Sequence, residues 1–351
     1  MTGPAAAVPP GPLTAVSFTG PDTRWDEFVT GCPEATFCHL SAWRRIMSGV
    51  LGHDCLFGVA QDDSGAWAGV LPLVRVKSAL FGHYLVSMPF LNYGGPIGTP
   101  TAKRVLKGWA IGEARGSGAN MVEFRSREFH DPELGPTAPK VTVLLRLPSS
   151  AELLWQGLAP KLRSQIRRPQ KEGMSVAFGA GQLDAFYEVF AGNMRDLGTP
   201  VLSKRFFGSL ATVMGDRTIV GVVYHRGRAV AAGFGFVWRD EFEMTWASSV
   251  REFNPLAPNM LLYWGFMERM IGAGIRVFNF GRCTPGAGTH RFKRQWGGTD
   301  VPLPWVAWMG DHPKARPSPD ESRYGLAVAT WRRLPLPVTK VIGPLLSRLL
   351  P

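Results

Sequence analysis

The stretches Gly65-Ala66-Trp67-Ala68-Gly69 and Gly227-Arg228-Ala229-Val230-Ala231-Ala232-Gly233 lie in the two halves of the chain and resemble each other. In each stretch, a glycine turn leads into small and apolar residues, which is the pattern of a turn that enters a β-strand. The segments around the two stretches also follow a similar order. We therefore expect two copies of one α+β module.

In the first half, strands at 55–60 and 67–76 are expected to form a hairpin around the turn at 62–65. Apolar residues behind Ser41 recur at helical spacing, which predicts a helix to about Leu51 as the first element, with Ser41 as its N-cap. The further elements expected are a strand at 84–89, a helix at 102–115, and strands at 121–125 and 141–147.

The second half repeats this order, and each module is expected to be a mixed, mostly antiparallel sheet flanked by helices. The elements expected there are helices at 183–197 and 204–214, a hairpin of 218–224 and 229–237, a strand at 243–247, a helix at 259–272 and a strand at 276–280. The boundaries expected are a disordered arm at 1–12, a first module at 13–147, a second module at 148–310, and a linker and tail at 311–351.

The composition agrees with a folded chain of about two domains. The length is 351 residues, 45% of them hydrophobic and 19% charged, which excludes global disorder. Lys and Arg number 39 against 27 Asp and Glu, and the resulting charge of +12 favours nucleic acid, phosphorylated substrates or an anionic membrane surface as partners. Because neither a secretory signal nor a run of about 18 apolar residues is present, we expect a cytoplasmic protein without a spanning helix.

The cysteines and histidines give no sign of a metal site. Neither the four cysteines nor the histidines have the spacing of zinc ligands, and no Ser-His-Asp or Cys-His arrangement is evident. The residues considered are Cys32, Cys38, Cys55, Cys283, His39, His53, His83 and His290. We expect neither a metal nor a disulfide, and no bound cofactor.

Three segments are candidates for chemistry, and the first is the basic run 161–171, with five cations and no acid. Arg163 and Arg167 are four residues apart and share a helix face, where two guanidinium groups could hold phosphates. The alternative is a solvated basic face.

The second segment, 281–298, is a glycine-rich loop with four cations, directly after a predicted strand. Backbone amides and charge in such a loop can approach an anion or a developing oxyanion, although it lacks the ending of a P-loop. The third segment, 193–200, places Arg195 at a helix end, where it could clamp a phosphate or merely stabilise the helix dipole.

Together these segments resemble the FemAB family, whose members are built from two GNAT-type modules. The resemblance extends from Phe37-Cys38-His39-Leu40-Ser41-Ala42-Trp43 to Arg291-Phe292-Lys293-Arg294-Gln295-Trp296-Gly297-Gly298. The chain is most similar to members associated with exosortase and PEP-CTERM exopolysaccharide systems, through the segments 69–73, 87–95, 193–200 and Gly281-Arg282.

The resemblance implies transfer of an amino acid from aminoacyl-tRNA, or of another acyl group, to an amine of a peptidoglycan or exopolysaccharide precursor that carries phosphate. It also implies that the ammonium of Lys293, at the family's Phe-Lys position, stabilises negative charge on the ester carbonyl. The substrate-binding residues expected with it are Arg44, Arg45, Tyr93, Arg163, Arg167, Arg195, Asn259, Arg282, His290 and Arg291.

Two positions depart from the family pattern. Pro169 interrupts the basic helix and predicts that it ends early. Asn279 takes the place of an acidic residue that often follows the phenylalanine of this strand, which weakens a role as general base there.

Two other functions stay open. An acetyl-CoA-dependent N-acetyltransferase would need a Gly-rich pyrophosphate turn, and neither 92–98 nor 251–258 has that pattern, so a donor other than CoA is favoured. The second alternative is a basic accessory protein that binds lipid-linked polysaccharide precursors without transfer, in which Lys293 would be dispensable. A monomer is expected in each case.

The tail, Tyr324 to Pro351, combines apolar residues at three- and four-residue steps with four cations. It could lie on the anionic inner face of the membrane, or it could pack back on the second module.

Overall fold

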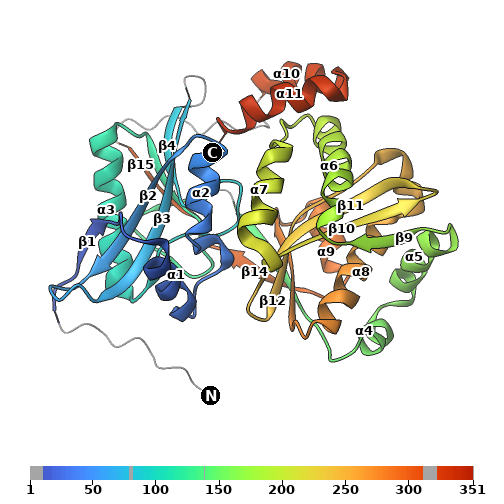
Figure 1. Cartoon of the computed structure of the whole chain (residues 1–351), viewed down its shortest axis with the longest axis horizontal. Helices are drawn as coiled ribbons and strands as arrows, with labels where there is room; N and C mark the ends of the chain where they lie inside the picture. Colours follow the sequence, from blue (N-terminus) through green and yellow to red (C-terminus); the bar gives the residue numbers. More distant parts are fainter. Residues whose placement is uncertain (1–10, 79–81, 138, 311–321, 351) are drawn as a thin grey trace. The chain divides into compact units, whose positions relative to one another are not determined.

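The computed structural model describes residues 11–350 apart from 79–81, 138 and 311–321. The chain divides into two compact units (Figure 1). The first unit contains 1–140, 302–317 and 348–351, and the second contains 141–301 and 318–347. Most of the expected arm and all of the expected linker at 311–321 lie outside the described residues.

The first unit is built on a mixed sheet with the strand order β1-β2-β3-β4-β6-β15-β7, and β5 pairs with β3. Its strands are β1 (Thr14–Ser17), β2 (Asp54–Gln61), β3 (Trp67–Ser78), β4 (Gly82–Val86), β5 (Ile97–Gly98), β6 (Met121–Phe124), β7 (Gly135–Pro136) and β15 (Val306–Met309). The predicted hairpin is confirmed as β2 and β3, whereas β4 and β6 pair in parallel.

Helices cover both faces of this sheet. The helices are α1 (Asp22–Gly31), α2 (Ala42–Gly49) and α3 (Pro100–Ser117). Phe57 of β2 meets Trp25 of α1, whereas the adjacent Gly58 faces Trp109 of α3. Since neighbouring residues of a strand point to opposite faces, α1 and α3 lie on opposite sides of the sheet.

The start of the first unit differs from the sequence prediction. Strand β1 and helix α1 precede α2, which was predicted as the first element. Ser41 does precede α2, but its hydroxyl donates to Asp26 Oδ2 at 2.8 Å and does not cap the helix. The helix ends at Gly49, short of the predicted Leu51.

The second unit contains the sheet β14-β8-β13-β12-β11-β10-β9. Its strands are β8 (Lys140–Arg146), β9 (Ser175–Phe178), β10 (Thr218–His225), β11 (Arg228–Trp238), β12 (Glu241–Ser249), β13 (Val277–Cys283) and β14 (Thr299–Leu303). The predicted hairpin is confirmed as β10 and β11, and β12 pairs with β13 in parallel.

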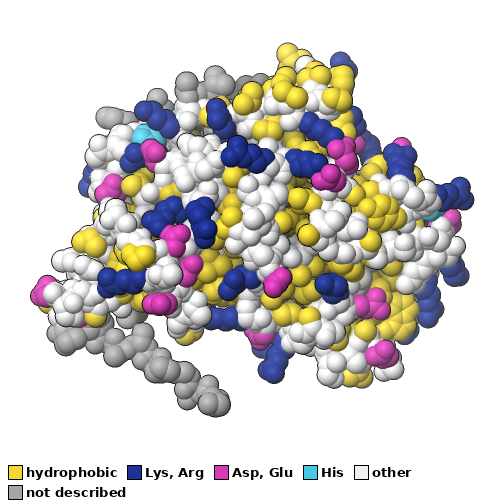
Figure 2. All heavy atoms as spheres, viewed as in Figure 1, with side chains coloured by type: hydrophobic (Ala, Val, Ile, Leu, Met, Phe, Trp, Pro, Cys, Tyr) yellow, Lys and Arg dark blue, Asp and Glu magenta, His cyan; other side chains and the backbone are white. Residues whose placement is uncertain are grey.

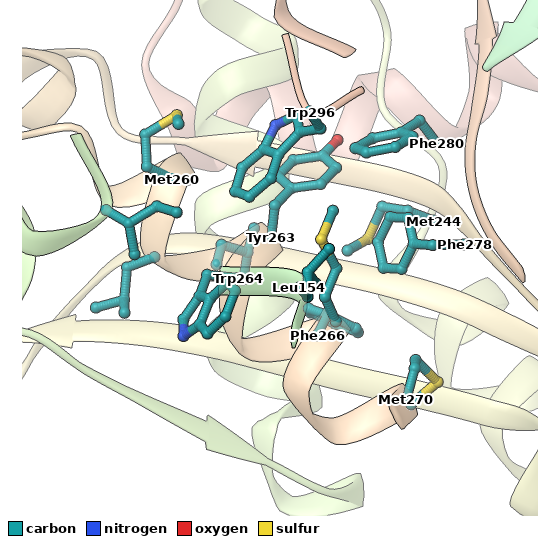
Figure 3. Packing of buried hydrophobic residues seen from close by; sticks show 14 of the residues in the cluster. Leu154, Met244, Met260, Tyr263, Trp264, Phe266, Met270, Phe278, Phe280 and Trp296 are labelled. Carbon is teal, nitrogen blue, oxygen red and sulfur yellow. The ribbon is translucent and has the colours of Figure 1, made fainter. Parts of the chain in front are cut away.

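Helices again cover both faces of the sheet. The helices are α4 (Ala151–Gly157), α5 (Pro160–Lys171), α6 (Leu183–Leu197), α7 (Lys204–Met214), α8 (Pro258–Gly272), α9 (Gly288–Arg294), α10 (Ser322–Arg333) and α11 (Leu336–Ser347). On β11, Phe234 packs on Phe186 of α6, and the adjacent Gly233 faces Phe266 of α8. The side of the sheet under α8 carries an aromatic and methionine-rich core (Figure 3).

Two further expectations are corrected. The strand predicted at 141–147 in the first module is β8, which pairs with β13 in the second sheet, because an antiparallel partner there covers the free side of β13. Helix α5 does not end early: it runs through Pro169 to Lys171. Pro169 lies in the last turn, where its missing N–H removes only one helical hydrogen bond, and its ring is buried.

Candidate functional site

A parallel pair of strands in the second unit separates partway along its length. The pairing of β12 with β13 runs from Glu241 opposite Val277 to Glu243 opposite Asn279. Beyond this point β12 continues to Ser249 and β13 to Cys283 without pairing to each other, although β12 stays paired with β11 and β13 with β8. The backbone groups that the two strands would share are therefore available for other contacts.

A β-bulge shapes the end of β13. The register with β8 shifts between Asn279, opposite Leu144, and Arg282, opposite Thr142. Gly281 lies within the bulge with φ of +71°, a conformation that a residue with a Cβ adopts only at a cost. The bulge thus explains why a glycine precedes Arg282 in the Gly281-Arg282 pair noted in the sequence.

The carbonyl groups of the bulge hold Lys293, which α9 carries back toward the strand. Lys293 Nζ donates to the carbonyl oxygens of Gly281 at 2.8 Å and Arg282 at 2.9 Å. The side chain is 8% exposed, and burial lowers the pKa of Lys293 to about 8, opposed by Cys283 and Glu243. The two acceptors are neutral carbonyls, so the ammonium is buried without a carboxylate in direct contact.

Asn279 connects this bulge to the buried carboxylate of Glu243 and the half-buried carboxylate of Glu241. Its Oδ1 accepts from Gly281 N–H at 2.8 Å and from Thr142 Oγ1 at 2.6 Å. Its Nδ2 donates to Glu241 Oε1 at 2.8 Å and Glu243 Oε2 at 3.1 Å. Asn279 is fully buried, and every one of its polar atoms is engaged, so its amide organises the site.

Glu243 is a site residue that the sequence analysis missed. It is 1% exposed, and Thr245 Oγ1 also donates to it at 3.3 Å. Glu243 stands between Phe242 and Met244 in a strand, where the alternation of acid and apolar residues is typical of an exposed acid. Only its pairing with Asn279 shows that the acid lies inside.

The other polar side chains of α9 close the glycine-rich loop on itself. His290 Nδ1 accepts from Gly286 N–H at 3.0 Å, so Nε2 donates to Asp300 at 3.0 Å. Arg291 donates to the carbonyl of Gly286 at 2.7 Å, and Arg294 donates to the carbonyl of Gly298. These contacts fix the loop that presents Lys293.

An aromatic wall lies behind the loop (Figure 3). The ring of Tyr263, on α8, is stacked on Phe280 with centroids 5.6 Å apart and meets Phe292 edge-on at 5.0 Å. Trp296 lies 6.3 Å from the same ring. Burial raises the pKa of Tyr263, so its hydroxyl stays protonated and the wall remains uncharged.

The remaining predicted residues of the second unit lie on three helices and at the end of one strand. On α5, Arg163 is half-buried, and Arg167 is exposed with its guanidinium 5.0 Å from the ring of Trp155. In the last turn of α6, Arg195 pairs with Asp196 at 2.7 Å. At the start of α8, Asn259 donates to Ser249 Oγ at 3.1 Å. Arg282 is exposed at the end of β13.

The predicted residues of the first unit form two groups. Arg44 and Arg45, on α2, both face Asp22. Tyr93 is 1% exposed, and the guanidinium of Arg127 lies 4.2 Å from the centre of its ring. Tyr93 also borders a small pocket with His39, whose pKa is lowered to about 4 by burial.

The first unit has its own parallel pair, β4 and β6, which ends at Val86 opposite Glu123. Here the chain that follows β4 returns to β6, because Ser87 N–H donates to the carbonyl of Glu123 at 2.9 Å and Gly95 N–H to that of Arg125 at 2.6 Å. The backbone between them includes Met88 and Phe90, which have φ of +57° and +69°. This return ends β4 at Val86, before the predicted Pro89.

Arg125 holds this returning segment from inside. It is 2% exposed and pairs with the buried carboxylate of Glu123 at 2.8 Å. Its guanidinium also donates to the carbonyls of Met88 at 3.4 Å and Leu91 at 3.3 Å, and it lies 4.8 Å from the centre of the Trp305 ring. In the first unit, the backbone that follows β4 therefore occupies the end of the β4–β6 pair.

No group of three or more His, Cys, Asp or Glu side chains that could hold a metal ion occurs among the described residues. None of the four cysteines forms a disulfide bond. Within the same part of the chain, none of the helices combines the length and hydropathy needed to cross a membrane.

Comparisons with known proteins agree with this architecture. Residues 160–294 match the family model described as an acetyltransferase (GNAT) domain, and no curated protein matches the chain. The crystal structure of FemX has a similar fold, with a TM-score of 0.61 at 12% identity over 84% of this chain and 97% of that one.

Two further solved structures have related folds. The C-terminal domain of a putative lysylphosphatidylglycerol synthetase from Agrobacterium fabrum has a TM-score of 0.54 at 14% identity, over 81% of this chain and 90% of that one. A tandem GNAT protein from the clavulanic acid biosynthesis pathway has a TM-score of 0.52 at 13% identity, over 86% and 100%.

The fold and the matched domain define the fold class: the chain is built from two GNAT-like units, and most of the second matches the acetyltransferase (GNAT) domain. Within this class, the FemAB-like organisation expected from the sequence motifs is confirmed at the level of the fold by the likeness to FemX. The α+β expectation of two mixed sheets flanked by helices is confirmed as well.

Proposed function

We propose that the protein transfers an amino acid from aminoacyl-tRNA, or another carrier-bound acyl group, to an amine of a phosphate-containing cell-envelope precursor. The observation that carries this proposal is Lys293, a buried ammonium held by two backbone carbonyls beside the separated strands β12 and β13. The FemX-like fold supports an aminoacyl donor. The lysylphosphatidylglycerol synthetase named among the similar structures supports a lipid-linked acceptor.

In the proposed reaction, the acceptor amine attacks the ester carbonyl, and negative charge develops on the carbonyl oxygen. Lys293 commits two of its three N–H groups to Gly281 and Arg282, and the third is left to donate to that oxygen. A C–N bond forms and the C–O ester bond breaks. The proton lost by the amine balances the proton gained by the leaving hydroxyl of the carrier.

Cations of the second unit would hold the phosphates of the substrates. Arg282 is exposed at the end of β13, and Arg163 and Arg195 are half-buried on α5 and α6. We propose that these residues, with Arg167, Asn259, His290 and Arg291, contact the substrates in the second unit. Arg44, Arg45 and Tyr93 are proposed to do so in the first.

The target and the place of action complete the proposal. A link with PEP-CTERM and exosortase systems rests on sequence segments such as 87–95 and 193–200, and it makes an exopolysaccharide precursor as plausible a target as a peptidoglycan precursor. We place the protein in the cytoplasm as a monomer that meets its acceptor at the inner face of the membrane.

The proposal is tested by mass spectrometry of lipid-linked envelope precursors from cells with and without the gene. Precursors should lose the mass of one aminoacyl or acyl group when the gene is deleted. Wild-type protein should restore that mass and Lys293→Ala should not. Lys204→Ala is the matched control, because Lys204 is a half-exposed lysine of the same unit that pairs with Asp184. Identical precursor masses in all strains would refute the proposal.

Acetyl-CoA is the second candidate donor, favoured by the match of residues 160–294 to an acetyltransferase domain. Against it, the turn before α8 contains Pro255 and the helix begins with Pro258, which removes backbone amides that a pyrophosphate would need. Calorimetric titration with acetyl-CoA distinguishes the two: saturable micromolar binding together with acetyl transfer would select CoA. An accessory role without catalysis predicts full function of Lys293→Ala.

A further inference from the structure

Helix α11 packs on the second unit with the face that is normally turned to water. Its buried residues are Thr339, Gly343 and Ser347, at four-residue steps along one side. The approach is close, because a Cβ on Gly343 would lie 3.0 Å from the backbone N of Val201 and 3.1 Å from its carbonyl oxygen. Small residues, and not large apolar ones, therefore make the contact with the unit.

The opposite side of α11 exposes large aliphatic side chains. Val338, Val341, Ile342 and Leu345 are 37%, 70%, 39% and 55% exposed. At about 100° of rotation per residue they share one face, roughly opposite the buried stripe. In the preceding helix, α10, Leu326 is 81% exposed. Figure 2 shows hydrophobic side chains gathered over these two helices.

Burying small residues and exposing large aliphatic ones is unfavourable for a helix that faces water. A helix on a globular protein ordinarily buries its apolar face and exposes its polar one. Exposed single apolar residues are common, but a continuous aliphatic ridge marks a surface that meets another apolar phase. We call the set Val338, Val341, Ile342 and Leu345 the aliphatic ridge.

The charge around the ridge indicates which apolar phase the ridge contacts. The segment from Ser322 to Pro351 contains no Asp or Glu, and it contains five cations. Arg332 and Arg333 are exposed at the end of α10, where Arg332 also donates to the carbonyl of Leu197 at 3.3 Å, and Lys340 pairs with Glu188 of α6. The segment itself carries only positive charge, with Glu188 of α6 paired to Lys340, and a positive segment suits an anionic surface. The ridge also lacks aromatic residues, which are enriched at the core of protein interfaces.

We propose that the aliphatic ridge inserts into the interfacial layer of an anionic lipid bilayer, with Arg332 and Arg333 at the headgroups. The two expectations for the tail are then compatible, because the small-residue stripe packs on the unit while the ridge faces lipid. The inference rests on the proposed function, because membrane binding would bring the site to a lipid-linked acceptor. Vesicle binding can be measured without substrate, so membrane binding and the transfer reaction can be refuted separately.

The test is flotation of the full chain with vesicles of phosphatidylcholine alone or mixed with phosphatidylglycerol. Wild-type protein should float with the anionic vesicles and not with the neutral ones. Val341→Glu with Leu345→Glu should lower the affinity more than tenfold, because two side chains can no longer enter the acyl region. Arg333→Gln should lower it about fivefold.

Leu153→Glu is the matched control, because Leu153 is a leucine of α4 in the same unit with 51% exposure. It should float like wild type. Circular dichroism should give the same melting curve for all variants, since the substituted side chains are exposed. Equal flotation of the ridge variant and the control would overturn the proposal. So would loss of a dimer, seen by light scattering, in the ridge variant when wild-type protein does not float.

Discussion

Each unit contains a parallel strand pair and, at its end, a buried cation that donates to two backbone carbonyls, but the two cations differ in what neutralises them. In the first unit, Arg125 bonds the carbonyls of Met88 and Leu91 and pairs directly with the carboxylate of Glu123. In the second unit, Lys293 bonds the carbonyls of Gly281 and Arg282, and Asn279 takes up the nearby carboxylates.

This difference gives the two cations different protonation behaviour. A guanidinium is always charged, and with Glu123 beside it Arg125 fixes a backbone segment and has no proton to exchange. The ammonium of Lys293 touches only neutral acceptors, so burial brings its pKa down to about 8. The two units thus hold different cations at the ends of their parallel strand pairs: one that is permanently charged and one that can titrate.

The largest effect is expected from breaking the ion pair of the first unit. Arg125→Met leaves the carboxylate of Glu123 buried without its partner and should lower the free energy of unfolding by about 3 to 5 kcal/mol. Denaturant titration measures this change. Arg125→Met with Glu123→Met should recover much of it. If the double variant were no more stable than the single one, the pair would not be the cause.

The next effect concerns transfer by the second unit. Lys293→Ala should lower the transfer rate by about 10²-fold or more, the scale for losing a donor to an oxyanion. It should leave the fold intact, as checked by circular dichroism. Lys293→Arg should also fail to restore the full rate, because a planar guanidinium cannot place a third N–H as the ammonium does. An unchanged rate for Lys293→Ala would remove this residue from the mechanism.

A smaller effect is expected at the residue that connects the acids to the bulge. Asn279→Asp keeps the size of the side chain but replaces its N–H donors to Glu241 and Glu243 with an oxygen. The free energy of unfolding should fall by about 1 to 3 kcal/mol at neutral pH, because buried carboxyl groups lose their donors. The loss should grow as pH rises, since the new acid must ionise beside two others. Denaturant titrations at several pH values test both parts.

The smallest effect is a shift in the titration of Lys293. Glu243 raises the pKa of Lys293 against the larger effect of burial, so Glu243→Gln should move the midpoint below about 8. Nuclear magnetic resonance of lysine labelled at Cε follows this midpoint without substrate. Lys204 serves as the internal reference, because it lies far along the sequence and pairs with Asp184. A midpoint that stays in place would mean that Glu243 does not act on Lys293.

The lowered pKa of Lys293 makes the free energy of unfolding depend on pH. The folded pKa of Lys293 lies below its ordinary value of 10.5, so the unfolded chain binds more protons between about 8 and 10.5. This residue therefore makes the folded state more stable as pH rises through that window, and its penalty is fully present below it. The contribution is measured as the difference between wild type and Lys293→Met, since other groups titrate there as well.

Local patterns predicted much of the fold. The repeated glycine turns predicted both hairpins, and the apolar periodicity predicted helices such as 183–197, which matches α6. The strand at 141–147 was assigned to the wrong sheet, because strand pairing across a long stretch of sequence leaves no local signal. The prediction that α5 ends early was also wrong. Here a local signal was present, but burial of Pro169 outweighed the tendency of proline to end a helix.

The sequence by itself determined that the chain holds two α+β modules, a strongly basic composition and a glycine-rich segment that contains Lys293, part of which is helix α9 in the structure. Only the tertiary structure decided that this lysine is buried on the carbonyls of a bulge, that Asn279 gathers Glu241 and Glu243, and that α11 turns its aliphatic side outward. The physical reason is that burial and long-range hydrogen bonds depend on which distant segments meet. Periodicity and composition record only what each segment prefers alone.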